Sequence, residues 1–248
     1  WRARSVAEQP RGALTFRVLP RHLYVHVPFC ARRCSYCDFS IAVRRDVPVS
    51  DYVQGVRSEL ELRGRGQERL VLDTLYLGGG TPSRLGGPGG AELLSTIGDH
   101  ARWDEGAEVT IEANPDDVSA ESARAWREAG VNRVSLGAQS FDPAALEWMR
   151  RSHSAGQIGH AVSLLRDADI REISIDLIFA LPASVPRSWE ADLAAALVLE
   201  PDHLSVYGLT VEPHTPLGRW RERGEIAESP DTTYERDFLL AHSMRGAA

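Results

Sequence analysis

Three cysteines placed close together are the clearest chemical feature of this sequence. Cys30, Cys34 and Cys37 lie within eight positions, with the spacing Cys-x3-Cys-x2-Cys, and the rest of the 248-residue chain contains no cysteine. So few thiols, in an odd number, cannot form a disulfide framework. Thiolates are soft ligands that bind zinc, copper(I) and iron-sulfur clusters. The segment is therefore predicted to be a metal-binding loop in a reducing compartment, and we expect a cytoplasmic protein.

Two kinds of metal centre are compatible with three thiolates. A structural zinc ion needs four ligands, and His26 is the residue nearby that could complete the set. Alternatively, the three thiolates could hold three irons of a 4Fe-4S cluster, which is fully protein-bound only with four ligands. The fourth iron would then be free to bind a small molecule. The shortage of thiols favours the cluster, and zinc stays as the alternative.

Short apolar segments rich in β-branched residues, each bounded by turn residues, are predicted to be the strands that position this loop. They lie at 22–27, 73–77, 108–112, 133–137, 172–178 and 203–207. Segments with helical periodicity separate them, and the first of these begins near Ser50, a favourable N-cap. Later helices are indicated by Ser119, which precedes Trp126 and a stop at Gly130, and by Asp142 followed by Pro143. The glycine-rich run at 86–90 is predicted to be a flexible loop.

Six alternating strand-helix units predict an α/β fold with a parallel sheet, because each strand must return through a crossover helix. The pattern is compatible with a partial barrel or with an open doubly wound sheet. In both folds chemistry occurs at the carboxyl ends of the strands. The distinctive residues follow this rule, since they come at or near the ends of five predicted strands: the cysteines, Gly78-Gly79-Gly80, Glu112, Gln139 and Asp176.

Several motifs, in order along the chain, resemble the radical S-adenosylmethionine (SAM) superfamily. They include the cysteine loop with Tyr36 before its last cysteine, and the segments 24–30, 77–82, 111–115, 137–141, 151–153 and 176–182. Within the superfamily they are similar to the branch that contains the oxygen-independent coproporphyrinogen III oxidase HemN and the heme chaperone HemW. This resemblance implies a partial (β/α)6 TIM-like barrel over residues 22–218, a 4Fe-4S cluster on Cys30, Cys34 and Cys37, and SAM as the second cofactor.

The resemblance also implies roles for individual residues. The glycine run, through Gly79, Gly80 and Thr81, would hold the amino group of SAM, since no Cβ obstructs the approach at a glycine. Arg151 would bind the carboxylate of SAM through its planar fork. Polar residues that would contact the ribose or its surroundings are Glu112, Gln139 and Asp176, and further SAM contacts are expected from Tyr24, Tyr36 and Thr210.

The residue two positions after Cys37 differs from the pattern of HemN-like oxidases, and this difference bears on function. In HemN-like oxidases a further cysteine lies two residues beyond the third cluster ligand, whereas this chain has Phe39 there. The sequence therefore favours a HemW-like protein that binds heme and delivers it to acceptor proteins. The alternative is a coproporphyrinogen III oxidase, in which SAM cleavage generates a radical that decarboxylates the substrate propionates. A zinc-stapled α/β binding domain is the second alternative. The expected partners are heme or a porphyrinogen, an electron donor and heme-acceptor proteins.

Composition excludes other classes and suggests boundaries. All 28 cations are arginines against 35 acids, and the resulting net charge of −7 argues against a general nucleic-acid-binding protein. No apolar run approaches the length of a membrane span. Residues 1–45 hold nine arginines and two acids, so an anionic partner or an arginine-rich leader is indicated. We expect a leader at 1–21 that is not a secretory signal, and at 219–248 the beginning of a truncated C-terminal region.

Overall fold

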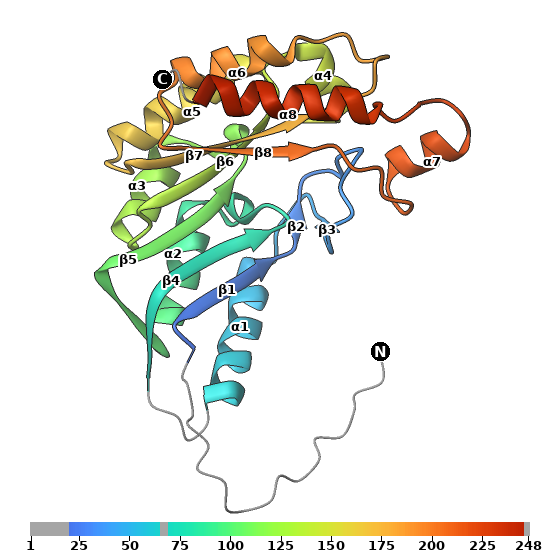
Figure 1. Ribbon diagram of the computed structural model, residues 1–248. Coiled ribbons are helices and arrows are strands. Elements are labelled where there is room, and N and C mark those ends of the chain that lie inside the picture. Colours follow the sequence, from blue (N-terminus) through green and yellow to red (C-terminus); the bar gives the residue numbers. More distant parts are fainter. Residues whose placement is uncertain (1–19, 65–68, 246–248) are drawn as a thin grey trace, which may run out of the picture.

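The computed structural model describes residues 20–64 and 69–245, and its centre is a parallel sheet of six strands (Figure 1). The strands are β1 (His22–Val27), β4 (Leu70–Gly79), β5 (Ala101–Ala113), β6 (Arg133–Gln139), β7 (Glu172–Phe179) and β8 (His203–Gly208). All five pairings between neighbouring strands are parallel. Each predicted strand is present, and β4 and β5 begin earlier than the sequence pattern predicted.

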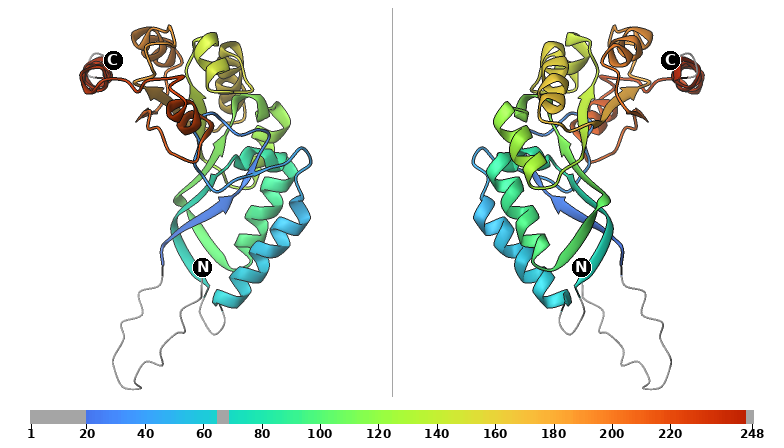
Figure 2. Two further views of the ribbon diagram at one scale, coloured as in Figure 1. Left: turned by 90° about the vertical axis from the view of Figure 1, so that its right-hand side faces the viewer. Right: turned by 90° about the vertical axis from the view of Figure 1, so that its left-hand side faces the viewer.

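The order of the strands decides between the two predicted architectures. Their spatial order, β1-β4-β5-β6-β7-β8, is the same as their order along the chain. A doubly wound sheet would reverse direction at a switch point, whereas this sheet winds in one direction throughout. The helices α1 (Val49–Gly64) and α2 (Gly86–Gly98) lie together on one face (Figure 2). The predicted α/β fold is confirmed, and the open, singly wound sheet has the arrangement of a partial TIM-like barrel.

Four further crossover helices follow along the chain, and the sequence predicted the capping residues of the first two. They are α3 (Ala120–Glu128), α4 (Pro143–Trp148), α5 (Ala155–Asp167) and α6 (Trp189–Val198). Ser119 caps α3 by accepting a hydrogen bond from the backbone N–H of Ser122, and Asp142 caps α4 through the N–H of Ala145. Two 3-10 turns, η1 (Pro82–Leu85) and η2 (Pro115–Asp117), follow β4 and β5. The caps fix where each chain segment leaves the carboxyl end of the sheet.

The prediction of a flexible loop at 86–90 is wrong, because these residues form the first turns of α2. The glycines are buried where α2 meets its neighbours. A Cβ on Gly87 would lie 2.9 Å from the Cβ of Ala125, and one on Gly90 would lie 3.0 Å from the indole nitrogen of Trp126. Glycine here permits close packing of α2 against α3. Tertiary contact thus overrides the low intrinsic helix propensity of glycine.

The two faces of the sheet differ in polarity. In β1, Val25 and Val27 are buried in the hydrophobic core that the crossover helices cover, while Tyr24 and His26 alternate with them on the other face. The same alternation in β5 and β7 places Glu112 and Asp176 on that second face, between buried apolar residues. The concave face of the partial barrel therefore carries the polar groups, and the convex face carries the core.

Four elements were absent from the sequence-based pattern of six units. A two-residue strand β2 (Phe29–Cys30) pairs with β3 (Ala42–Val43) and closes the cysteine loop at its base. The helix α7 (Pro216–Glu222) follows β8, so the predicted boundary at residue 218 falls inside it. The last helix, α8 (Asp231–Arg245), packs against α6, β7 and β8. No helix in the described ranges is long and apolar enough to span a membrane. The predicted leader at 1–21 lies almost wholly outside the described residues.

Candidate functional site

The cysteine loop begins directly after β1 and is anchored at both ends. The backbone N–H of Ala42 donates to the carbonyl of Pro28 at 2.7 Å, and that of Arg44 donates to the carbonyl of Cys30 at 2.9 Å. In the middle of the loop, Ser35 bonds through its backbone to Met149 and to Leu217. The loop is thereby held between the α4 segment and α7. It presents its three thiols at the carboxyl end of the sheet.

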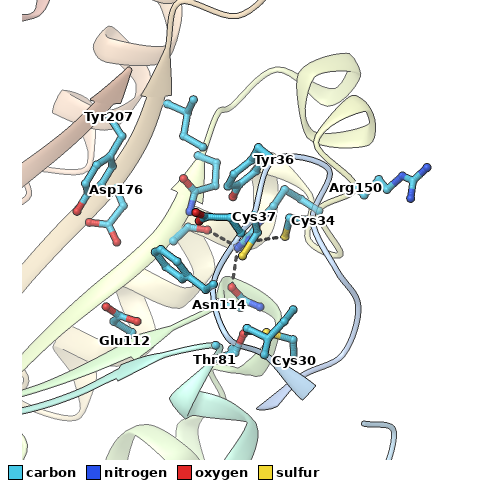
Figure 3. Close-up of a pocket in the computed structure, with 18 of the residues that line it drawn as sticks. Cys30, Cys34, Tyr36, Cys37, Thr81, Glu112, Asn114, Arg150, Asp176 and Tyr207 are labelled. Atoms are coloured by element: carbon cyan, nitrogen blue, oxygen red, sulfur yellow. Dashed lines mark hydrogen bonds between the residues drawn. The ribbon is translucent and has the colours of Figure 1, made fainter. Parts of the chain in front are cut away.

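A cavity of about 430 Å³ opens beside this loop, above the carboxyl ends of the strands. That volume lies within the range of small-molecule sites. Figure 3 shows Cys34 and Cys37 on one side of the cavity, and Glu112 and Asp176 on the opposite side. Of the residues predicted from the sequence, those that line the cavity are Cys30, Cys34, Tyr36, Cys37, Gly79, Gly80, Thr81, Glu112, Gln139, Arg151, Asp176 and Thr210. The structure thus brings residues from the ends of several strands together at one cavity.

Tyr24 is the predicted site residue that does not line this cavity. Its ring stacks on that of Tyr76, with centroids 6.0 Å apart, and its hydroxyl lies 3.2 Å from Nδ1 of His26. The side chain is 56% exposed on the concave face. A contact between Tyr24 and SAM stays a prediction, and in this structure Tyr24 supports Tyr76 instead.

The electrostatics of the thiols favour a cationic or metallic partner. Burial raises the pKa of Cys30 and of Cys37, while the nearby Arg33 acts in the opposite direction on both. Nη1 of Arg151 lies 3.4 Å from Sγ of Cys34. Buried thiols are costly to ionise without such a partner, so iron bound to all three sulfurs would compensate for the unfavourable burial of their charge.

His26 does not complete a tetrahedral metal site. Its Nε2 lies 2.9 Å from the carbonyl of Ser40, and its Nδ1 faces the Tyr24 hydroxyl. Within the described ranges, no three His, Cys, Asp or Glu side chains are grouped closely enough to hold a single metal ion. Three sulfurs that each bind a different iron of a cluster are further apart than the ligands of one ion. The zinc alternative therefore gains no support from this arrangement.

The glycine run brings β4 close to the cysteine loop. Gly79 has a φ of +117°, a left-handed value that favours glycine, and a Cβ on Gly80 would lie 2.8 Å from the carbonyl oxygen of Pro28. Thr81 contacts Sγ of Cys30 through its hydroxyl at 3.4 Å. Glycine at positions 79 and 80 thus permits the close approach of β4 to the cysteine loop.

Two partly buried carboxylates face the cavity, and each has hydrogen-bond donors. Glu112 accepts from the hydroxyl of Tyr76 at 2.9 Å and from the N–H of Gly79 at 3.0 Å. Asp176 accepts from the hydroxyl of Ser135 at 2.9 Å. Burial raises the pKa of both carboxyls, and these hydrogen bonds oppose the shift. Both groups are therefore oriented acceptors, suited to the hydroxyl or amino groups of a bound nucleoside.

Arg151 connects the cysteine loop to two strands. Its Nη2 donates to Oδ1 of Asn114 at 2.6 Å and to the carbonyl of Gly137 at 2.8 Å, while Nε has no partner among the described residues although it is buried. Burial alone would lower its pKa, but Tyr36 and Cys34 raise it. The guanidinium is thus a fixed cation at the cavity wall, with one donor still unused.

A buried ion pair outside the cavity supports Gln139. The carboxylate of Asp192 in α6 accepts from the hydroxyl of Ser140 and the N–H of Phe141, both at 2.7 Å, and from Nη1 of Arg187 at 2.5 Å. Gln139 itself has a φ of +68°. Sequence analysis missed Asp192, since an acid in a helix is usually solvated. It also missed Asn114 and Ser135, although Asn114 follows β5 directly and the strand-end rule could have found it.

Comparison with known proteins agrees with this geometry. The family model described as the radical SAM superfamily matches residues 24–194. The chain belongs to the radical SAM superfamily. Membership implies a 4Fe-4S cluster and SAM, and the site fits both. Three thiols, one buried and two partly buried, lie on one loop with no fourth cysteine in the sequence. Beside them is a cavity with an unused Arg151 donor and oriented carboxylates.

The relatives divide between two named activities. The chain is 38% identical over 230 residues to heme chaperone HemW of Escherichia coli and 37% identical over 232 residues to that of Mycobacterium tuberculosis, covering 92% of this chain and 60% of each relative. It is 36% identical over 251 residues to an oxygen-independent coproporphyrinogen III oxidase of Bradyrhizobium diazoefficiens, covering 99% of this chain and 54% of the relative. The chain therefore spans little more than half the length of these relatives.

A solved structure gives the same family. Coproporphyrinogen III oxidase (HemN) from Escherichia coli superposes with a TM-score of 0.77 at 27% identity, over 89% of this chain and 51% of that one. The radical SAM methyltransferase TsrM from Kitasatospora setae, with a TM-score of 0.58 at 18% identity, shares the fold. The recognition of the family from its motifs is confirmed, and so is the partial barrel that the motifs implied.

Proposed function

We propose that this chain is the cluster- and SAM-binding part of a heme-trafficking protein similar to HemW, acting in the cytoplasm. The similarity to HemW proteins at 34–38% identity supports this proposal, but Phe39 is the observation that carries it. Phe39 lies where the oxidase branch has an additional cysteine, and it lines the cavity with 60% of its surface exposed. An apolar ring there suits binding of a hydrophobic macrocycle better than it suits redox chemistry.

The mouth of the cavity has further apolar surface. Tyr207 at the end of β8 is 56% exposed, and Ile41 and Leu209 also line the cavity. Aromatic side chains stack favourably on flat conjugated rings. These residues support binding of heme beside Tyr207, Ile41 and Leu209, and the polar groups between the cysteines and Glu112 support binding of SAM.

Each part of the chain has a task in this proposal. The three thiolates hold the cluster, Gly79, Gly80 and Thr81 cradle the amino group of SAM, and Arg151 orients its carboxylate. Glu112, Gln139 and Asp176 face the nucleoside. When bound, the reduced cluster supplies one electron to SAM. The surrounding residues orient SAM and exclude water, which is the usual contribution of a protein to cofactor chemistry.

The test is anaerobic reconstitution of the full-length protein with iron and sulfide, followed by electron paramagnetic resonance with and without SAM. We expect a 4Fe-4S signal that changes when SAM is added, and saturable uptake of heme in a spectral titration. Replacing Phe39 with Ala should weaken heme uptake while the response to SAM persists. A reconstituted protein that takes up no heme would overturn the chaperone proposal.

The oxidase is the second candidate, favoured by the 36% identity to the Bradyrhizobium diazoefficiens enzyme over nearly the whole chain. It requires SAM-dependent conversion of coproporphyrinogen III to protoporphyrinogen IX under anaerobic conditions. The same reconstituted sample serves for this assay. Formation of protoporphyrinogen IX would support the oxidase function instead of the chaperone function. Uptake of heme without formation of protoporphyrinogen IX would support the chaperone function.

A further inference from the structure

Four arginines surround the outer side of the cysteine loop, and we refer to Arg32, Arg33, Arg44 and Arg150 as the arginine surface. Arg32 and Arg33 lie between the first two cysteines, Arg44 follows β3, and Arg150 follows α4. A second hollow is lined by Arg32, Arg33, Arg150 and Arg151, with Glu147 as its one carboxylate among the described residues. The chain as a whole carries a net charge of −7, so this surface has the opposite sign to the rest of the molecule.

The charges of the arginine surface are not neutralised within the protein. None of the four arginines forms an ion pair with a carboxylate in the described part of the chain, where many other arginines do. Arg33 and Arg44 donate only to the carbonyls of Cys37 and Val43. Unpaired cations of one sign produce a field that attracts an anionic partner and accelerates its association.

The arginine surface borders the SAM cavity and extends beyond it, because Arg32 and Arg150 also line the cavity whereas Arg33 and Arg44 do not. The side chain of Arg150 points away from Cys34 (Figure 3) and its guanidinium lies 5.1 Å from the centre of the Trp220 ring. The residues that line the cavity include Arg151 but neither Arg33 nor Arg44, so a small anion inside the cavity would not contact the whole arginine surface. The surface is nevertheless in direct contact with the cluster loop, since Arg33 donates to the carbonyl of Cys37 at 3.3 Å and the N–H of Arg44 to that of Cys30 at 2.9 Å.

From this arrangement we propose that the arginine surface is the docking site of a small acidic electron-carrier protein. The inference rests on the proposed function, because the cluster must gain one electron before it can pass one to SAM. In the step at this surface one electron leaves the flavin or iron-sulfur centre of the carrier and reduces the 4Fe-4S cluster, and no bond forms or breaks. Acidic side chains on the carrier would pair with the four guanidinium groups, and docking there brings the two redox centres together across the cysteine loop.

The test compares two reductants on the reconstituted full-length protein. The probe is an acidic bacterial flavodoxin, reduced photochemically, and the reference is dithionite, a small molecule that needs no docking surface. The rate of cluster reduction is followed by stopped-flow absorbance for the wild type and for the double variant Arg32→Glu, Arg44→Glu. Both side chains are exposed, so the variant should fold. Arg102→Glu, at the exposed amino end of β5, is the matched control, and Arg32→Gln, Arg44→Gln removes the charge without reversing it.

We expect the flavodoxin-dependent rate to fall about ten-fold or more in the Glu variant and by less in the Gln variant. It should also fall with increasing salt in the wild type, since screening weakens such attraction. Dithionite should reduce the Glu variant at the wild-type rate, and flavodoxin should reduce the Arg102→Glu variant at the wild-type rate. If flavodoxin reduces the Glu variant at the wild-type rate, the docking site is overturned. The same holds if the Glu variant loses heme uptake while its reduction by flavodoxin is unchanged. If dithionite produces no SAM-responsive cluster in the wild type, the proposed function itself fails.

Discussion

At the scale of single residues, Arg151 makes contacts in the structure that its sequence motif did not predict. The family resemblance implies that Arg151 binds the carboxylate of SAM. In the structure its guanidinium also contacts Cys34, Asn114 and Gly137. Lysine retains the charge but loses the planar fork. Replacing Arg151 with Lys therefore tests whether SAM binding depends on the planar shape of the guanidinium or on its charge alone.

We expect Arg151→Lys to form the cluster but to bind SAM roughly ten- to hundred-fold more weakly, because each hydrogen bond to a charged group contributes about 1.5–3 kcal/mol. Titration of the cluster's paramagnetic signal with SAM measures this affinity. Arg127→Lys, which alters an exposed ion pair with Asp169, is the control. Equal SAM affinity in Arg151→Lys and wild type would show that charge alone is sufficient.

His153 is a buried residue that makes stability depend on pH. Its Nε2 donates to the carbonyl of Ala138 at 3.0 Å, and burial lowers its pKa from 6.5 to about 4. Below pH 6.5 the unfolded chain therefore binds a proton at His153, whereas the folded chain binds it only near pH 4. The free energy of unfolding consequently decreases as the pH is lowered from 6.5 to 4.

The His153→Gln variant retains a donor for Ala138 but does not titrate. Between pH 7 and pH 5 we expect the free energy of unfolding of the wild type to fall by about 2 kcal/mol relative to the variant. Urea unfolding at several pH values measures the difference. Parallel pH curves for the two proteins would contradict the assignment of a neutral, buried His153.

At the scale of elements, the packing of α2 on α3 depends on glycines that the sequence suggested were a loop. Gly87→Ala would place a Cβ 2.9 Å from both the Cα of Ser122 and the Cβ of Ala125, and overpacking of this kind costs about 1–3 kcal/mol. The matched control is Gly55→Ala in α1, where a Cβ has no neighbour within 4 Å. That variant should gain up to about 1 kcal/mol from helix propensity. Thermal unfolding should therefore shift in opposite directions for the two variants, and a stable Gly87→Ala protein would contradict the close packing.

The junction between β6 and α4 depends on α6 through Asp192. Removing one partner of a buried ion pair costs about 3–5 kcal/mol, so Asp192→Asn should lower stability and should also weaken SAM binding by loosening the loop that holds Gln139. Ser140→Ala removes two hydrogen bonds, the one that its hydroxyl donates to Asp192 and the one that it accepts from the N–H of Asp142, and each contributes about 1 kcal/mol. Chemical denaturation and SAM titration measure the two effects. Lower stability with unchanged SAM affinity in both variants would show that Asp192 acts on the fold alone.

At the scale of the whole molecule, the structure joins a well-packed sheet to a loop that is held by a few backbone hydrogen bonds. The sheet and its helices form one large core, whereas β2 and β3 contribute two residues each to the anchoring of the cysteine loop. Regions with few buried contacts open locally before the core does. Removal of iron by chelation should therefore speed hydrogen exchange in residues 30–41 and leave β4–β7 unchanged. Faster exchange throughout the sheet would indicate that the cluster stabilises the entire fold.

The sequence by itself determined the strands, the metal-binding loop and the edge of the sheet where chemistry occurs. Periodicity and caps are local, and residues at the ends of parallel strands meet at one edge whatever the crossover direction. Tertiary structure alone decided the single direction of winding, the helical state of Gly86–Gly90, the position of Tyr24 outside the cavity and the network of Arg151 with Asn114. These depend on contacts between residues far apart in the chain, which no local pattern specifies. The same holds for Asp192, whose partners Ser140 and Phe141 lie on another element.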